Sequence, residues 1–233
     1  HQRKDLEDRV SEARLTARGD NPSDLRRALG QLEEALALDG KDAAALSLAA
    51  SLEAERLLTH HEEDGVHHLR VRARSRATEL SGRAADVDAQ TAERFSTEAL
   101  LALERGEGQR AREILRPLLD AGANHPLVLY AASLASRDAG NLSDAHAQLL
   151  GAMEGARGQP RFPLAYAASA VDEGRLEPAA DVLERTLIRN EGHLGSLLLA
   201  GLVGAYRGRV GPEARALVAQ LQSRGGEALS PAL

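Results

Sequence analysis

Four histidines gather in one charged stretch of this 233-residue sequence, and they are the side chains best suited to metal chemistry. His60, His61, His67 and His68 flank three carboxylates, and imidazole together with carboxylate suits Zn, Ni or Cu. However, Gly65 interrupts the helix that would align them, and no established metal spacing such as His-Glu-x-x-His occurs. We therefore predict a solvated polar loop, keep a metal site as a weak alternative, and expect no metal and no cofactor.

Arginines at every second position follow the histidines. On a helix, Arg70 and Arg74 form one column and Arg72 and Arg76 an adjacent one, a strip that could meet phosphates or an acidic partner. No aromatic residue is interleaved for base stacking, so we expect no nucleic-acid binding. The favoured interpretation is a solvated helix face whose arginine stems cover apolar neighbours.

No arrangement of residues indicates catalysis. The run from Gly106 to Ala111 begins like a dinucleotide-binding fingerprint, but that fingerprint follows a strand, and a helix is predicted here. The spacing of Ser, His and Asp selects no catalytic triad, and the absence of cysteine excludes thiol catalysis and disulfides. The sequence therefore predicts a protein that is not an enzyme.

Composition limits the other classes of function. The net charge of −6 is mild and mixed in sign, so it creates no field that would recruit nucleic acid. No apolar run approaches the roughly 20 residues that span a bilayer. The chain opens on His1 and its only methionine is Met153, so we expect a fragment or mature domain. Its compartment stays open between the cytoplasm and the periplasm of a bacterium.

A regular series of glycines, called here the glycine ladder, indicates how the helices of the chain are arranged. Gly106, Gly140, Gly174 and Gly208 are 34 residues apart, and alanines and leucines keep the same step. The alanines are Ala111, Ala145 and Ala179, and the leucines are Leu115, Leu149 and Leu183. A stack of two-helix units explains such a period, because each unit buries its face against a neighbour of the same shape.

The stretch from Pro126 to Gln159 shows one predicted unit. Apolar residues at helical spacing end at Gly140, a residue type that adopts positive φ at the end of a helix without a Cβ clash. A second helix then begins near Leu142, with Ser143 or Asp144 as its expected cap. The same analysis predicts a helix from Asp42 to Leu58 and a second helix of the last unit carrying Ala214, Val218 and Leu221.

These units resemble the tetratricopeptide repeat (TPR) family, which uses 34-residue helix-turn-helix units with small residues at fixed positions. Its first small position is matched by Ala50, Ala99, Ser133, Ala167 and Gly201. Ala28, Leu32 and Ala35 fit the second helix, and Gly140-Asn141 fits the turn. The family's usual Trp is replaced by Leu46, Phe95, Leu129, Pro163 and Leu197. The resemblance implies an all-α, right-handed α-solenoid of about five or six antiparallel helix pairs.

The register of the repeat breaks once. Ala28 and Ala111 are 83 residues apart instead of two periods, so about 15 extra residues lie between them. We therefore divide the chain into N-terminal repeats (1–58), a His- and Arg-rich insertion with a lengthened helix (59–91) and a regular stack (92–233). Such insertions emerge on one face of an array, sometimes the face that binds a partner.

The resemblance also implies a concave groove lined by the first helix of each pair. Because the Lys and Asn residues of the family's carboxylate clamp are missing, we expect an apolar groove that holds a helical or hydrophobic segment of a partner protein. The expected groove residues are Leu100, Leu103, Tyr130, Leu134, Arg137, Arg161, Leu164, Val171, Leu198, Leu202 and Tyr206.

Three other interpretations stay open. The apolar stripe could be covered by the chain's own termini or neighbouring helices. The array could belong to a bacterial envelope or secretion assembly and dock through residues 59–88. Self-association is possible, because no polar capping helix is obvious near Gly225 and Gly226.

Overall fold

Helices make up all the regular structure that the computed structural model describes, which covers residues 2–59, 67–87 and 90–208. Unit 1 (His1–Gln159) and unit 2 (Pro160–Leu233) are separate compact bodies, and we describe each by itself. Unit 1 contains α1 (Gln2–Thr16), the 3-10 helix η1 (Ala17–Gly19), α2 (Pro22–Leu38), α3 (Ala43–Thr59), α4 (His67–Asp86), α5 (Ala92–Glu104), α6 (Gly108–Asp120), α7 (Pro126–Asp138) and α8 (Leu142–Gly155). The described part of unit 2 contains α9 (Arg161–Asp172), α10 (Leu176–Arg189) and α11 (Leu194–Tyr206).

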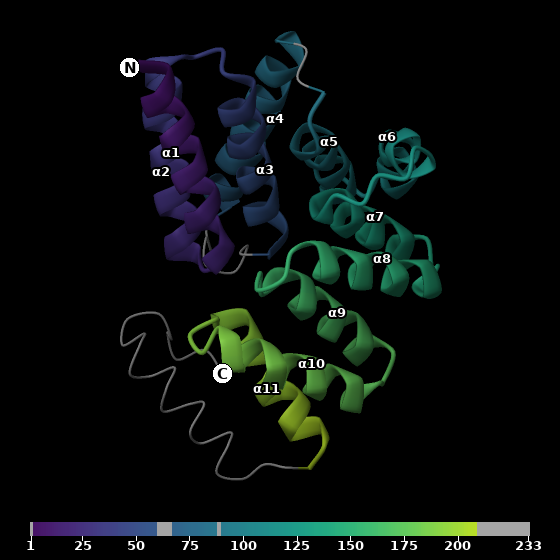
Figure 1. The fold of residues 1–233 in the computed structure, drawn as a ribbon. Coiled ribbons are helices and arrows are strands. Elements are labelled where there is room, and N and C mark those ends of the chain that lie inside the picture. The colour runs from purple at the N-terminus through teal and green to yellow at the C-terminus, as the bar shows by residue number, and fades with distance from the viewer. Residues whose placement is uncertain (1, 60–66, 88–89, 209–233) are drawn as a thin grey trace. The chain divides into compact units, whose positions relative to one another are not determined.

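The helices pack as successive pairs (Figure 1). In unit 1, α1 packs against α2, α3 against α4, α5 against α6 and α7 against α8; in unit 2, α9 packs against α10. The first helices of successive pairs also touch: α3 contacts α5, α5 contacts α7, and in unit 2 α9 contacts α11. This confirms the prediction of an all-α helical repeat.

The ladder glycines make the bends as predicted. Gly106, Gly140, Gly174 and Gly208 have φ of 77°, 75°, 73° and 68°. At Gly140 the amide of Asn141 donates to the Ser136 carbonyl at 2.9 Å, and the Gly140 amide donates to the Arg137 carbonyl at 2.9 Å. This is the paired hydrogen bonding of a Schellman turn, which needs a residue with positive φ.

Alanine and leucine fill the interior between the paired helices. The second-helix alanines Ala111, Ala145 and Ala179 are fully buried, and so, to within a few per cent, are Leu115, Leu149 and Leu183. The first-helix positions Ala50, Ala99, Ser133 and Ala167 are buried too. Small residues at these places let paired helices approach closely, and one added methylene there would overfill the contact.

The predicted insertion with its lengthened helix, residues 59–91, includes α4. This helix has 20 residues, whereas α5 to α11 have 12 to 14. Residues 60–66, with His60 and His61, lie outside the described residues, as do the predicted helix positions Ala214, Val218 and Leu221. None of the helices in the described ranges combines the length and apolarity needed to span a bilayer.

One predicted cap is wrong by two residues or more. Neither Ser143 nor Asp144 caps α8; the N-cap is Asn141, whose side chain accepts from the Asp144 amide. Its Nδ2 also donates to Asp144 Oδ2 at 2.6 Å. The Schellman turn at Gly140 places Asn141 one residue later, where its amide oxygen reaches the free amides of the next helix.

Candidate partner-binding surfaces

The eleven expected groove residues differ widely in exposure. Leu100, Tyr130 and Arg161 are buried at 1%, 4% and 5% exposure, so they pack inside their units. Leu103, Leu134, Leu164 and Val171 are half-buried, whereas Arg137, Leu198, Leu202 and Tyr206 are exposed. The first five in sequence belong to unit 1 and the other six to unit 2, and each share is considered separately.

Tyr130 on α7 is buried, and its electrostatic neighbours include Asp20 from the turn between α1 and α2. Burial raises the pKa of its phenol, the nearby Asp20 carboxylate raises it further, and Arg137 lowers it. Asp20 follows η1 and is itself buried, with a left-handed φ of 52°. At 4% exposure, Tyr130 belongs to the interior of unit 1 and is not part of its accessible surface.

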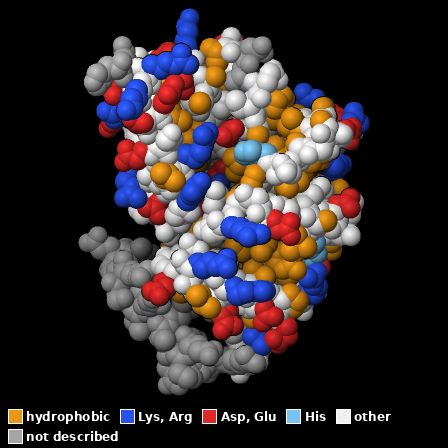
Figure 2. All heavy atoms as spheres, viewed as in Figure 1, with side chains coloured by type: hydrophobic (Ala, Val, Ile, Leu, Met, Phe, Trp, Pro, Cys, Tyr) orange, Lys and Arg blue, Asp and Glu red, His pale blue; other side chains and the backbone are white. Residues whose placement is uncertain are grey.

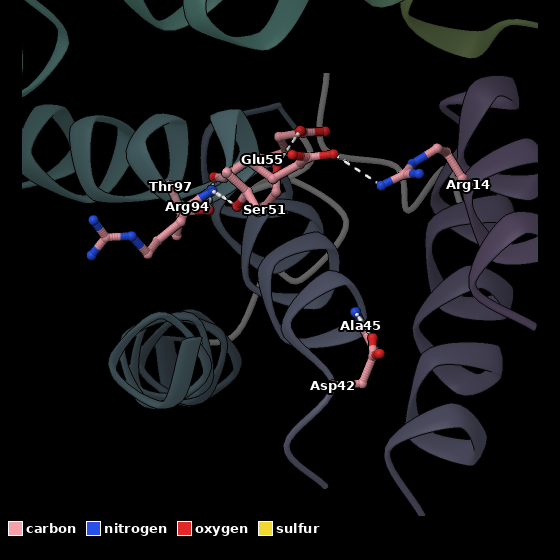
Figure 3. A network of polar contacts seen from close by, with 9 residues as sticks. Arg14, Asp42, Ala45, Ser51, Glu55, Arg94 and Thr97 are labelled. Atoms are coloured by element: carbon pink, nitrogen blue, oxygen red, sulfur yellow. Dashed lines mark hydrogen bonds and ion pairs between the residues drawn. The ribbon is translucent and has the colours of Figure 1, made fainter. Parts of the chain in front are cut away.

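A second contact joins α1 to the later helices of unit 1 (Figure 3). Arg14 Nη2 on α1 donates to Glu93 Oε1 on α5 at 3.0 Å, although the two residues are 79 positions apart. Burial lowers the pKa of His125, the N-cap of α7, while Glu93 raises it and Arg14 lowers it. Charged groups of α1 and α5 and the start of α7 therefore lie close together within unit 1.

Polar side chains are also buried where α3 meets α5. Ser51 Oγ donates to Glu55 Oε1 at 2.9 Å, and both side chains are buried. Figure 3 shows these two residues beside Thr97 of α5, whose hydroxyl donates to the Glu93 carbonyl at 2.8 Å. We interpret this cluster as structural, because its side chains are buried and the hydrogen bonds of Ser51 and Thr97 are made within their own helices. The sequence contained one signal for this cluster, since Ser47, Ser51 and Glu55 are four residues apart and so share one face of α3.

In unit 2, α11 exposes a row of large apolar side chains. Leu194, Leu198, Leu202 and Tyr206 are four residues apart, with exposures of 41%, 48%, 47% and 66%. We call these four residues the α11 row. The other side of the helix, with Ser196, Leu197 and Val203, is buried. The helix carries no charged residue, and helices that are apolar on all sides are normally covered on all sides.

The start of α11 is held in place by a buried histidine. His193 is 3% exposed, and its Nδ1 accepts from the Ser196 amide at 3.2 Å. Ser196 Oγ lies 2.8 Å from the same nitrogen. His193 was not singled out from the sequence, although a histidine directly before an apolar run can act as a cap. Its role here is to cap α11, since its ring nitrogen accepts from one of the free amides at the start of the helix.

Only part of the His- and Arg-rich segment is described, and that part shows no arrangement of side chains that indicates a binding site. His67 and His68 begin α4, but their side chains lie outside the described part. Arg74 pairs with Glu104 of α5, and Arg76 pairs with Glu79 at 3.1 Å. Arg72 is exposed, and the side chain of Arg70 lies outside the described part. No group of three or more His, Asp or Glu side chains able to hold a metal ion occurs within the described ranges. Basic and acidic side chains are interspersed on the face shown in Figure 2.

Comparison with solved structures identifies the fold. PilW, a type IV pilus biogenesis factor, matches with a TM-score of 0.58 and 18% identity over 95% of this chain and 94% of its own. PilF of Pseudomonas aeruginosa matches with a TM-score of 0.52 and 16% identity, over 97% of this chain and 94% of its own. The TPR protein TTC0263 of Thermus thermophilus matches with a TM-score of 0.61 and 15% identity, over 87% of this chain and 98% of its own.

At these identities the matches establish the fold alone. No protein-family model and no curated protein sequence matches the chain. The structural neighbours are TPR proteins, and the 34-residue ladder, its glycine turns and its buried alanines agree with them.

Proposed function

We propose that this chain, a divergent member of the TPR fold, is a non-catalytic scaffold that binds a partner protein through the exposed side chains of its first helices. The observation that carries the proposal is the α11 row, four large apolar side chains that the described structure leaves open to solvent. Monomeric proteins seldom expose contiguous apolar surface without a binding role.

The proposed surface is smaller than the groove expected from the sequence. Leu198, Leu202 and Tyr206 form its centre, because they are exposed and belong to one helix face. Leu164 and Val171 of the same unit are half-buried, and the residues of unit 1 are not counted as part of this surface. Leu100, Tyr130 and Arg161 are left out because they are buried.

Affinity purification with matched variants tests this proposal. We expect the tagged wild-type chain to retain a partner protein that Leu198→Asp plus Leu202→Asp loses. Leu15→Asp is the control, because Leu15 is 59% exposed on the polar helix α1 of the other unit. Circular dichroism must show unchanged helix content for all three proteins. Equal retention by the row variant and the control would refute the proposal.

A second candidate function is a role in a bacterial envelope assembly such as the type IV pilus. It is favoured by the similarity to PilW, a type IV pilus biogenesis factor, which covers 95% of this chain and 94% of PilW. In this case we propose docking through residues 59–88, where Arg72 is exposed.

Deletion of residues 59–68 separates the two candidates. The envelope role through the insertion predicts that this deletion abolishes surface pili and partner retention. It also predicts that the variant Leu198→Asp plus Leu202→Asp keeps both. Unchanged pili in a strain lacking the whole gene would exclude a pilus role.

A further inference from the structure

Three ionisable side chains from different parts of unit 1 lie close together near the start of α7. Arg14 Nη2 on α1 donates to Glu93 Oε1 on α5 at 3.0 Å, and the charges of both residues act on His125, the N-cap of α7. The Glu93 side chain is 15% exposed, whereas that of Arg14 is 48% exposed. One largely buried carboxylate therefore interacts with two basic side chains.

One ring nitrogen of His125 is available for a further hydrogen bond. Within the described residues, Nδ1 of His125 is buried and has no hydrogen-bond partner. His193, two 34-residue periods later and also an N-cap, instead uses its Nδ1 to accept from the Ser196 amide at 3.2 Å. A proton taken up by the neutral His125 ring creates a second N–H donor, which needs an acceptor. Glu93 is the carboxylate whose charge favours that proton.

Other charged residues at the helix ends around His125 are exposed. The helices packed against α7 are α5, α6 and α8, and the end of α8 lies at the start of α7, since a Cβ built on Gly155 would be 3.0 Å from Pro126 Cγ. The exposed charged residues near these ends are Asp120, Glu154 and Arg157. Water and salt screen such groups, so Glu93 and Arg14 dominate the electrostatics of His125.

The two basic side chains differ in how easily they can leave the carboxylate. His125 precedes Pro126, and its backbone, with φ of −66° and ψ of 129°, has the extended conformation that a residue before proline prefers. The half-buried imidazole is therefore held at the start of α7. Arg14 has a long and half-exposed side chain whose guanidinium can move into water. When both groups are charged, Arg14 is the one that leaves.

We propose that Arg14, Glu93 and His125 form a proton-sensitive latch between α1 and α5. With His125 neutral, Arg14 holds Glu93 and the latch is closed. A proton on His125 makes the imidazolium the partner of Glu93, and Arg14 is released to solvent. The helix itself stays folded, because Leu6, Val10 and Ala13 belong to a core that α1 shares with α2. This inference concerns unit 1 and does not depend on the α11 row.

The latch should open as the pH falls. Burial lowers the pKa of His125, Glu93 raises it and Arg14 lowers it, so the ring takes up its proton below its ordinary value of about 6.5. Linkage is reciprocal, so a proton on His125 disfavours the nearby Arg14 charge by as much as that charge disfavours the proton. The closed latch therefore belongs to neutral and higher pH.

Energy transfer between two dyes on the full chain tests whether the latch positions α1. The chain has no cysteine, so Asp8→Cys on α1 and Ala147→Cys on α8 supply two exposed labelling sites in unit 1. Arg14→Gln removes the latch at any pH. The labelled wild type at about pH 5 should therefore show the transfer efficiency that Arg14→Gln shows at about pH 7.5. His125→Gln should keep the efficiency of the wild type at about pH 7.5 under both conditions.

Three results of this experiment would overturn the latch. The first is an efficiency in the wild type that does not change with pH. The second is a change with pH that persists in His125→Gln. The third is an equal efficiency for Arg14→Gln and wild type at about pH 7.5.

Titration of the His125 ring by nuclear magnetic resonance measures the coupling directly, with His125→Gln to assign the signal. Arg14→Gln should raise the pKa of His125 by about 0.5 or more, because a like charge is removed, and Glu93→Gln should lower it by a similar amount. Arg9→Gln is the control, since Arg9 also lies on α1 but pairs with Glu34. Equal pKa values in all these proteins would contradict the coupling. Shifted pKa values with unchanged energy transfer would show coupled groups that hold nothing in place, and the latch would be wrong.

Discussion

At the residue scale, the bends of the array depend on glycine at positions with positive φ. Gly140 has φ of 75°, and nothing lies within 4 Å of a Cβ built on it, so only the backbone conformation resists substitution. Gly30 offers a contrast: it lies inside α2 with equal space around its Cβ position and no positive φ. A Cβ would therefore find free space at both Gly140 and Gly30, and the two glycines differ only in their backbone conformation.

We predict opposite effects of alanine at these two glycines. Gly140→Ala should lower the free energy of unfolding by about 1 kcal/mol, because a left-handed conformation disfavours a Cβ. Gly30→Ala should raise it by up to about 1 kcal/mol, because alanine is the better helix former. Urea denaturation followed by circular dichroism measures both, and two changes of the same sign would contradict this explanation of the ladder.

His125 should make the stability of unit 1 depend on pH. Burial lowers its pKa in the folded state, so the unfolded chain binds the proton more tightly and stability rises with pH. The stabilisation should be complete above the unfolded pKa of about 6.5 and should be lost as the pH falls below it. His125→Gln should flatten this part of the stability profile between about pH 5 and 7.5, measured by urea denaturation. A profile unchanged by the substitution would show that other groups cause it.

At the element scale, the sequence predicted helices and bends well because both recur. The glycine positions, the buried alanines and the pairing of helices all follow from a 34-residue period that any one unit repeats. The cap of α8 was predicted wrongly, since several polar residues follow Gly140 and the turn geometry decides between them. Local propensity alone cannot make that choice.

Substitutions at the start of α8 check the corrected cap. Asn141→Ala should lower the free energy of unfolding by about 0.5–2 kcal/mol, because the Asp144 amide loses its acceptor. Ser143→Ala should have almost no effect, since Ser143 is exposed and does not cap the helix. Equal decreases in the free energy of unfolding for the two substitutions, measured by chemical denaturation, would contradict Asn141 as the cap of α8.

The close approach of α7 and α8 leads to a further prediction for packing. Ala145 is fully buried, so Ala145→Leu should destabilise the chain by about 1–3 kcal/mol through overpacking. Ala147 lies exposed on the same helix, and Ala147→Leu should change stability by less than about 0.5 kcal/mol. Thermal denaturation of the two variants measures the difference between them, and similar melting temperatures would contradict the close packing of α7 and α8 at Ala145.

At the scale of the whole molecule, the sequence predicted less of the binding surface than of the fold. It could not show that Arg14 reaches Glu93, or that Asp20 lies near Tyr130, because contacts between distant residues leave no periodic signal. The apolar side chains of α11 can be read from the sequence, but only their exposure in the structure distinguishes them from the buried or half-buried side chains one and two periods earlier on α9 and α7.

Photo-crosslinking in living cells tests the central claim, that the α11 row binds a partner protein. A benzophenone amino acid replaces Leu202 in the full chain, and the control chain carries it at the exposed Leu15. The account predicts an adduct with one protein from position 202 that is absent from position 15 and disappears with Leu198→Asp. The same adducts from both positions, or none from position 202, would contradict it.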